Sequence, residues 1–178
     1  MTALVFPTMD RYEEWADCVA EFLQAYPAGS GLPETEGPTD VGPEAYAASV
    51  TRSELFRDES AALPGTRIHS DYLWITDDEQ IVGFLRFTYA LNDFLLSVGG
   101  HIGYSVRPSR RREGHASRAL GLALERARAR GIDHVLVTCD ETNVASARTI
   151  ESQGGRLEDV REGKRRYWIT VPSAPAQD

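Results

Sequence analysis

Apolar residues in the first third of the chain recur at helical spacing. Over residues 10–26 they fall at intervals of three and four, at Trp15, Val19, Phe22 and Leu23. This period predicts an amphipathic helix with Asp10 as its cap. A second helical stretch is predicted over 44–63. The intervening segment, 27–43, is rich in Gly, Pro, Thr and Glu and predicts a long loop.

The pattern then changes to that of β-strands. Two apolar runs, 72–75 and 81–87, are separated by the acidic residues 77–79, which predicts a β-hairpin. Residues 101–106 form a further strand pattern that Pro108 ends, because proline cannot donate to a strand ladder. At the start of the chain, residues 4–6 form a short apolar run, which predicts a first strand.

Strand and helix patterns alternate in the second half. In the clearest helix the small and apolar residues share one face, and Gly131 follows where a terminating glycine is expected. Asn143 is a possible cap of the next helix. The elements expected here are a helix over 113–130, a strand over 134–139, a helix over 144–152 and a strand pair over 156–160 and 165–171.

This order of elements predicts a mixed α/β or α+β sheet with a crossover through the long helix. The chain has 178 residues, a length that suits one domain with a sizeable core. We expect a single domain over 1–171 and a disordered tail over 172–178.

Charge and cysteine content narrow the function classes. The formal net charge of −8 argues against a general binder of nucleic acid or membrane surfaces, since such proteins need a basic face. Cys18 and Cys139 lie far apart and have no metal or redox spacing, so no metal is expected and a reducing cytoplasm is favoured. The sequence also shows no apolar run of membrane-spanning length and no signal-peptide pattern.

One local basic cluster stands apart from the acidic average. Five arginines, at 107, 110, 111, 112 and 118, fall within twelve positions. There a strand ends and a helix is expected to begin near Gly114. The first amides of a helix lack internal partners and carry the positive end of the helix dipole, and Gly114 and Ala116 are small. The segment therefore predicts a phosphate or pyrophosphate site. The alternative is a solvated basic turn with a glycine that only eases helix entry.

The motif Arg111-x-x-Gly114-x-Ala116 resembles the Arg/Gln-x-x-Gly-x-Gly/Ala signature of the GNAT superfamily of N-acetyltransferases. The resemblance extends over 72–171 and is closest to a bacterial group of predicted acetyltransferases. The stretches shared with that group are Gly100 to Pro108 (GHIGYSVRP), Thr138-Cys139-Asp140 with Asn143, and Ile150-Glu151 before Gly154-Gly155. It implies a mostly antiparallel central sheet of about seven strands flanked by helices, and acetyl-CoA as the co-substrate.

The resemblance also implies which residues bind the co-substrate. Main-chain groups of the strand would pair with the pantetheine arm, amides of the following loop would hold the pyrophosphate, and Asn143 would contact the cofactor or serve only as a cap. The residues concerned are Tyr104, Ser105, Val106, Arg111, Arg112, Glu113, Gly114, His115, Ala116, Ser117 and Asn143.

The catalytic groups are less well defined by the sequence. His101 is one candidate base; its alternative role is to hold the Gly99-Gly100 bend. Glu141, next to Asp140, is a second candidate, or a solvated acid. Many members of the superfamily have a proton-donating tyrosine at the position of Ile150. Tyr104 could replace it, or could simply be half-buried, in which case solvent would protonate the thiolate.

The acceptor side carries the weakest signal. Arg86, Tyr89 and Asn92 are predicted at the rim of the acceptor pocket. Acidic residues could attract a cationic amine or merely keep the loop solvated; these are Glu34, Glu36, Asp40 and Glu44. The predicted activity is transfer of an acetyl group to a primary amine of a small molecule or peptide by direct attack. The alternatives are a CoA-binding or interaction module with little catalysis and a phosphate-binding regulatory domain. Pairing of terminal strands could give a homodimer.

Overall fold

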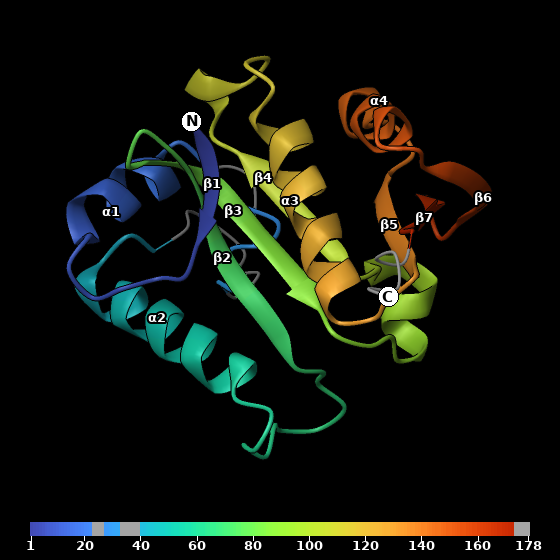
Figure 1. Ribbon diagram of the computed structural model, residues 1–178. Helices are drawn as coiled ribbons and strands as arrows, with labels where there is room; N and C mark the ends of the chain where they lie inside the picture. The colour runs from blue at the N-terminus through green and yellow to red at the C-terminus, as the bar shows by residue number, and fades with distance from the viewer. Residues whose placement is uncertain (23–26, 33–39, 173–178) are drawn as a thin grey trace, which may run out of the picture.

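The sheet of the protein is open and has seven strands in the order β1-β2-β3-β4-β5-β7-β6 (Figure 1). The computed structural model describes residues 1–22, 27–32 and 40–172. All neighbouring strands are antiparallel except β4 and β5, which are parallel. The strands are β1 Thr2–Val5, β2 Ser70–Asp77, β3 Gln80–Thr88, β4 Ile102–Val106, β5 His134–Asp140, β6 Arg156–Arg161 and β7 Lys164–Thr170. The predicted mixed, mostly antiparallel sheet is therefore confirmed.

Helices cover both faces of this sheet (Figure 1). On one face, α1 (Tyr12–Ala20) and α2 (Pro43–Arg57) pack against Trp74, Ile81 and Phe84. On the other face, α3 (His115–Ala129) and α4 (Val144–Ser152) pack against a larger core. The alternation of side chains along each strand divides the core in this way. None of the helices in the described ranges is long and apolar enough to cross a membrane.

The acidic turn between β2 and β3 forms the predicted hairpin. Asp78 and Glu79 both have positive φ, 45° and 71°, as a two-residue turn of this twist requires. The helix α4 and its cap Asn143 also agree with the prediction, since Asn143 Oδ1 accepts a hydrogen bond from the Ser146 amide.

Other predicted boundaries need correction. The first helix begins at Tyr12 after Arg11, so Asp10 is not its cap, and it ends at Ala20. The second helix ends at Arg57, before the predicted limit at 63. Parts of the predicted first helix, loop and tail, at 23–26, 33–39 and 173–178, lie outside the described residues.

One element was not predicted at all. Residues Leu95–Gly99 form a short π-helical turn, η1, which Gly100 closes at φ 65°. A side chain at Gly100 would lie only 2.7 Å from the Leu136 carbonyl oxygen, so both the positive φ and the space require glycine. The turn lies immediately before β4.

Candidate functional site

The parallel strands β4 and β5 pair over a very short length and then diverge. In the described residues their register contains one pair, Ile102 with Val137. Immediately before it, the His101 amide donates to the Leu136 carbonyl at 2.7 Å. Past this point β4 continues to Val106 against β3 alone. The sheet thus opens between its two halves.

The free edge of β4 has a defined set of hydrogen-bonding groups. The Thr88 amide donates to the His101 carbonyl, and the Arg107 amide donates to the Val82 carbonyl. Because antiparallel neighbours alternate, the odd-numbered residues of β4 face β3. The main-chain groups of Tyr104 and Val106 therefore point into the opening. They can pair with an extended ligand, as a sheet edge pairs with an added strand.

The loop after β4 presents a row of unpaired amides. A single 3-10 turn, η2 (Pro108–Arg110), leads into the loop, and α3 begins at His115. Within the described chain, no main-chain N–H from Arg112 to Ser117 donates to a protein acceptor. These amides lie at the positive end of the α3 dipole. Such a row is a site for phosphate groups.

Gly114 shapes this loop through its own conformation. Its φ is +84°, in the left-handed region, and a Cβ there would lie 2.7 Å from a guanidinium nitrogen of Arg118. Arg112 also has a positive φ of 65°. The left-handed backbone therefore favours glycine at this position, and the end of the Arg118 side chain packs beside it.

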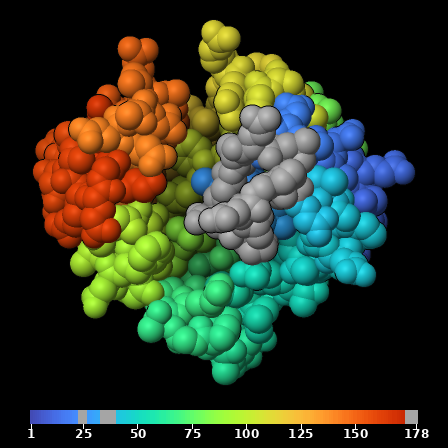
Figure 2. Space-filling view, turned by 180° about the vertical axis from the view of Figure 1, so that it is seen from behind, coloured from blue at the N-terminus to red at the C-terminus, as the bar shows by residue number. Residues whose placement is uncertain are grey.

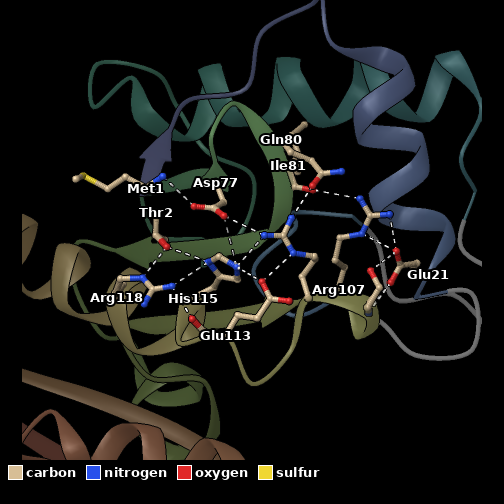
Figure 3. Close-up of polar contacts among 12 residues, drawn as sticks. Met1, Thr2, Glu21, Asp77, Gln80, Ile81, Arg107, Glu113, His115 and Arg118 are labelled. Carbon is tan, nitrogen blue, oxygen red and sulfur yellow. Dashed lines mark hydrogen bonds and ion pairs between the residues drawn. The ribbon is translucent and has the colours of Figure 1, made fainter.

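A buried polar network supports the loop from behind (Figure 3). The His115 side chain is only 2% exposed. Its Nδ1 lies 2.9 Å from Thr2 Oγ1, and its Nε2 lies 3.2 Å from Glu113 Oε2. The Arg118 guanidinium donates to Thr2 Oγ1 at 2.8 Å and to the Glu113 carbonyl at 2.6 Å. The loop is thus fastened to β1, which lies more than a hundred residues away in the sequence.

A second set of contacts fixes the start of the loop. Glu21 accepts hydrogen bonds from the Ser109 amide at 2.8 Å and from Arg107 Nε at 2.6 Å. Burial would raise the pKa of Glu21, but these donors hold it below its ordinary value. Arg110 pairs with Asp77 of β2 at 2.9 Å. Figure 3 shows both groups of contacts on the same side of the loop.

The two remaining arginines of the cluster are exposed beside the free amides. Arg111 donates through Nε to the Val106 carbonyl at 3.1 Å, which links the loop to the end of β4. Arg112 is exposed. Together with the amides, these guanidinium groups supply charge-assisted donors for an anionic ligand.

Tyr104 lies on the wall of the opening. Its hydroxyl is 3.0 Å from Ser146 Oγ of α4, and burial raises its pKa to about 12. The phenol is therefore neutral at physiological pH. Figure 2 shows the surface hollowed between α4 (orange) and the loop after β4 (yellow). Ile150, by contrast, has no exposed surface and belongs to the core.

The geometry of His101 argues against its use as a base. The side chain is 6% exposed, and its Nδ1 accepts a hydrogen bond from the Leu136 amide at 3.0 Å. Burial lowers the pKa of His101 to about 4. In the neutral ring Nδ1 is occupied and Nε2 carries the proton. The contacts favour the alternative role, a histidine that holds the bend before β4 against β5.

The two acids at the end of β5 have different surroundings. Asp140 pairs with Lys164 of β7 at 2.5 Å. Glu141 is exposed, and its amide donates to the Gly163 carbonyl at 2.9 Å. Of the two, Glu141 keeps a carboxylate without a partner among the described residues.

The residues predicted at the acceptor rim do not form one group. Tyr89 donates to Asp71 Oδ1 at 2.6 Å, and the Arg130 guanidinium lies 3.3 Å from the centre of its ring. The hydroxyl of Tyr89 is thus bound within the protein, and its role at the acceptor rim stays a prediction. Asn92 donates to the Thr66 carbonyl at 2.8 Å and accepts from the Leu95 amide at 2.9 Å, so it holds the segment that leads into η1.

Arg86 remains as a candidate contact on the face of α1 and α2. Of the acidic residues considered with it, Glu34 and Glu36 lie outside the described residues. Asp40 accepts a hydrogen bond from the Gly42 amide at 2.8 Å, and Glu44 lies in the first turn of α2. Among the described residues, no cluster of His, Cys, Asp and Glu could hold a metal ion.

Comparison with known proteins agrees with this geometry. Residues 41–154 match the model of the acetyltransferase (GNAT) family. Searching the curated proteins gave no match. Among solved structures, the microcin C7 self-immunity acetyltransferase MccE, in complex with acetyl-CoA and AMP, superposes with a TM-score of 0.69 at 15% identity over 96% of this chain and 92% of that chain.

Two further structures are similar in fold. RimJ of Mycobacterium smegmatis, in complex with a CoA disulfide, gives a TM-score of 0.70 at 18% identity over 96% of this chain and 82% of that chain. RimL, a ribosomal L7/L12 alpha-N-protein acetyltransferase, gives 0.66 at 17% identity over 96% and 90%. At these identities the likeness shows a shared fold.

Proposed function

The chain belongs to the acetyltransferase (GNAT) family, and from this premise we propose that it transfers an acetyl group from acetyl-CoA to a primary amine of a small molecule or peptide. The observation that carries the proposal is the row of unpaired amides from Arg112 to Ser117 beside an open strand edge. A pyrophosphate linked to an extended amide-containing arm is complementary to both features.

The residues of the opening fit acetyl-CoA in a consistent order. The amides of the loop, with Arg111 and Arg112, would hold the pyrophosphate. The main-chain groups of Tyr104 and Val106 would pair with the pantetheine arm along β4. Asn143 caps α4 through its Oδ1, which leaves its amide group for a contact with the ligand. When bound, acetyl-CoA supplies an acetyl group activated as a thioester.

For acetyl transfer the protein needs to position the two substrates and to provide for proton transfer. A free alkyl amine has a pKa near ~10 and must lose a proton before it attacks. Its lone pair then forms the C–N bond as the C–S bond breaks, and the new amide nitrogen releases its extra proton to solvent. The amide of Val106 or of a neighbouring β4 residue would polarise the carbonyl, and Tyr104 would protonate the departing thiolate. Glu141 is the remaining candidate to accept the proton of the amine, directly or through water.

Binding of the co-substrate tests the proposal most directly. Isothermal titration with acetyl-CoA should give saturable binding, and inorganic pyrophosphate should compete only weakly because it lacks the pantetheine arm. No binding of acetyl-CoA at high micromolar protein would overturn the proposal. A preference for simple phosphates over acetyl-CoA would favour a phosphate-binding regulatory domain.

A second function has one observation in its favour. Ile150 is fully buried, so α4 offers no acid at the position where many family members have a tyrosine. A CoA-binding module with little catalysis would have the same feature. A panel of amines assayed by release of free thiol separates the two functions. Thiol release that depends on an amine supports the enzyme, and tight acetyl-CoA binding without release under any amine supports the module.

A further inference from the structure

We propose that Arg86 binds the acceptor, and that the acceptor is an amine carrying a carboxylate group. The inference rests on the proposed function, since it takes the acceptor to approach the parted strands from the face covered by α1 and α2. It concerns which amine is bound and adds no step to the transfer.

Arg86 lies level with the point where the sheet opens. On β3 it pairs with Gly103 of β4, the residue directly after Ile102, where β4 and β5 last pair. Side chains alternate along β3, so Arg86 shares the face of Phe84, which packs with α1 and α2. The opposite face of the same opening carries Tyr104 and α4. A group held by Arg86 would therefore lie across the opening from the proposed proton donor.

The absence of a side chain at Gly103 lets Arg86 extend toward the parted strands. Its guanidinium reaches the Gly99 carbonyl at the end of η1, at a long 3.4 Å. On the other side, the segment 27–32 lies over β4, where a Cβ on Gly29 would be 2.5 Å from the Gly103 carbonyl oxygen. Ser105 also donates to the Ala28 carbonyl at 2.8 Å. Arg86 thus stands between two walls, 27–32 and η1.

The hydrogen-bonding capacity of Arg86 is largely unused. Its Nε is buried and has no acceptor in the part of the chain that the structure describes, although the side chain as a whole is partly exposed. Among the described residues, no carboxylate lies within ion-pair distance of it. Two other arginines with little exposure are paired, Arg107 with Glu21 at 2.5 Å and Arg166 with Asp159 at 2.8 Å.

An unpaired guanidinium in such a place favours a planar anion. An orphaned buried donor costs free energy, and a carboxylate can accept two parallel N–H bonds from an arginine. Lysine would supply the charge without the fork. The chemistry therefore points to an aminocarboxylate acceptor rather than an unsubstituted amine.

The acetylated products serve as probes that need no turnover. With the protein saturated with CoA, N-acetylglycine, N-acetyl-β-alanine and N-acetyl-γ-aminobutyrate are titrated against their carboxamides, and N-acetylaminomethylphosphonate is included as a second anion. We expect at least one carboxylate to bind about tenfold or more tightly than its own carboxamide, as for a charge-assisted contact. In Arg86→Gln the preference should disappear, and in Arg86→Lys it should fall.

The matched control is Arg128→Gln. Arg128 is exposed near the end of α3, and its side chain makes no hydrogen bond or ion pair to a described residue, so this variant should keep the full preference. Thermal melting confirms that each variant is folded, and Arg86→Lys carries the test should Arg86→Gln prove unstable.

Several results would overturn the inference. They are equal binding of carboxylates and carboxamides, no binding of any carboxylate, tighter binding of the phosphonate, or an unchanged preference in both Arg86 variants. Titration of acetyl-CoA on the same samples separates the two proposals. Where acetyl-CoA binds and carboxylates show no preference, the role of Arg86 fails alone; where acetyl-CoA does not bind, the proposed function fails.

Discussion

The Tyr104 hydroxyl of β4 lies 3.0 Å from Ser146 Oγ in the first turn of α4. This contact bridges the opening between the two halves of the sheet on the side of α3 and α4. It places a neutral phenol, with its pKa raised to about 12 by burial, beside the arm of the proposed co-substrate. The proposed proton donor thus comes from β4, whereas the position of Ile150 on α4 is fully buried.

Replacing Tyr104 with Phe should therefore lower kcat. General acid catalysis commonly contributes about 100-fold or more, although a thiolate is a weak base that solvent can also protonate, so we expect a loss of at least about tenfold. The affinity for acetyl-CoA should change little, because the main chain of β4 makes the proposed contacts. Steady-state kinetics and titration with acetyl-CoA measure the two effects.

Ser146→Ala is the matched control for Tyr104. It removes the hydrogen-bond partner and leaves the phenol, so kcat should fall much less than in Tyr104→Phe. Equal losses in the two variants, or an unchanged kcat in Tyr104→Phe, would remove Tyr104 from the mechanism.

Gly114 offers a test of the phosphate loop. Gly114→Val should abolish measurable acetyl-CoA binding, because valine strongly disfavours a φ of +84° and its Cβ would meet Arg118. We expect a stability cost of about 1–3 kcal/mol from the strained backbone. Isothermal titration and chemical denaturation measure the two effects.

The same helix supplies a control glycine. Gly121 lies within α3, and a Cβ there would make only an ordinary contact of 3.5 Å with Gln153. Gly121→Ala should raise the free energy of unfolding by about 0.5–1 kcal/mol through helix propensity and leave acetyl-CoA binding unchanged. Weaker binding in both variants would indicate a general effect on α3 instead of a loop-specific one.

His115 is predicted to act as a positioning residue. Its ring joins Thr2 of β1 to Glu113 of the loop, so His115→Leu should remove this link between the strand and the loop, although Arg118 still donates to Thr2 and Arg110 to Glu113. We expect weaker acetyl-CoA binding by about tenfold and a lower Tm, with a smaller effect in His115→Gln. His134→Gln is the control, because His134 is exposed at the start of β5. Unchanged affinity in His115→Leu would limit the network to stability.

Much of the fold could be predicted from local pattern. The acidic turn at 77–79, the glycine after α3 and the cap Asn143 each act over a few residues, so their consequences are legible in the sequence. The end of α1 and the π-helical turn Leu95–Gly99 could not be predicted in this way. Packing against the sheet determines where α1 ends, and Gly100 closes the π-helical turn. Tertiary contacts overrode propensity at these places.

The part of the candidate site that consists of main-chain groups could be predicted from the sequence. The free amides of 112–117 follow from a strand, a glycine and a helix in sequence. The partners that hold the loop did not follow, since Thr2, Asp77 and Glu21 come from elements far apart in the chain. The burial of His101, which argues against its use as a base, could not be predicted either, because spacing in the sequence does not report burial of a polar residue.

The position of Ile150 gives a prediction about the missing tyrosine. Ile150→Tyr should not restore a faster enzyme, because the side chain has no exposed surface and lies against Gly155. Overpacking at such a site costs about 1–3 kcal/mol. Chemical denaturation should show the loss of stability, and kcat should not rise. A folded variant with higher kcat would show instead that this position faces the sulfur.

The buried histidine before β4 should make stability depend on pH. The folded-state pKa of His101 is lowered to about 4 from 6.5 by burial, so between these values the unfolded chain binds a proton that the folded chain does not. The free energy of unfolding should therefore be fully supported above pH 6.5 and fall as the pH drops toward 4, by up to about 3 kcal/mol from this group. His101→Asn removes the titration and keeps an acceptor for the Leu136 amide. Chemical denaturation at several pH values gives the free energy of unfolding of both proteins, and the wild type should lose more of it toward acid.

If the free energies of the two proteins instead fall in parallel with pH, His101 is protonated in the folded protein as readily as in the unfolded chain. Such a result would support the use of His101 as a base.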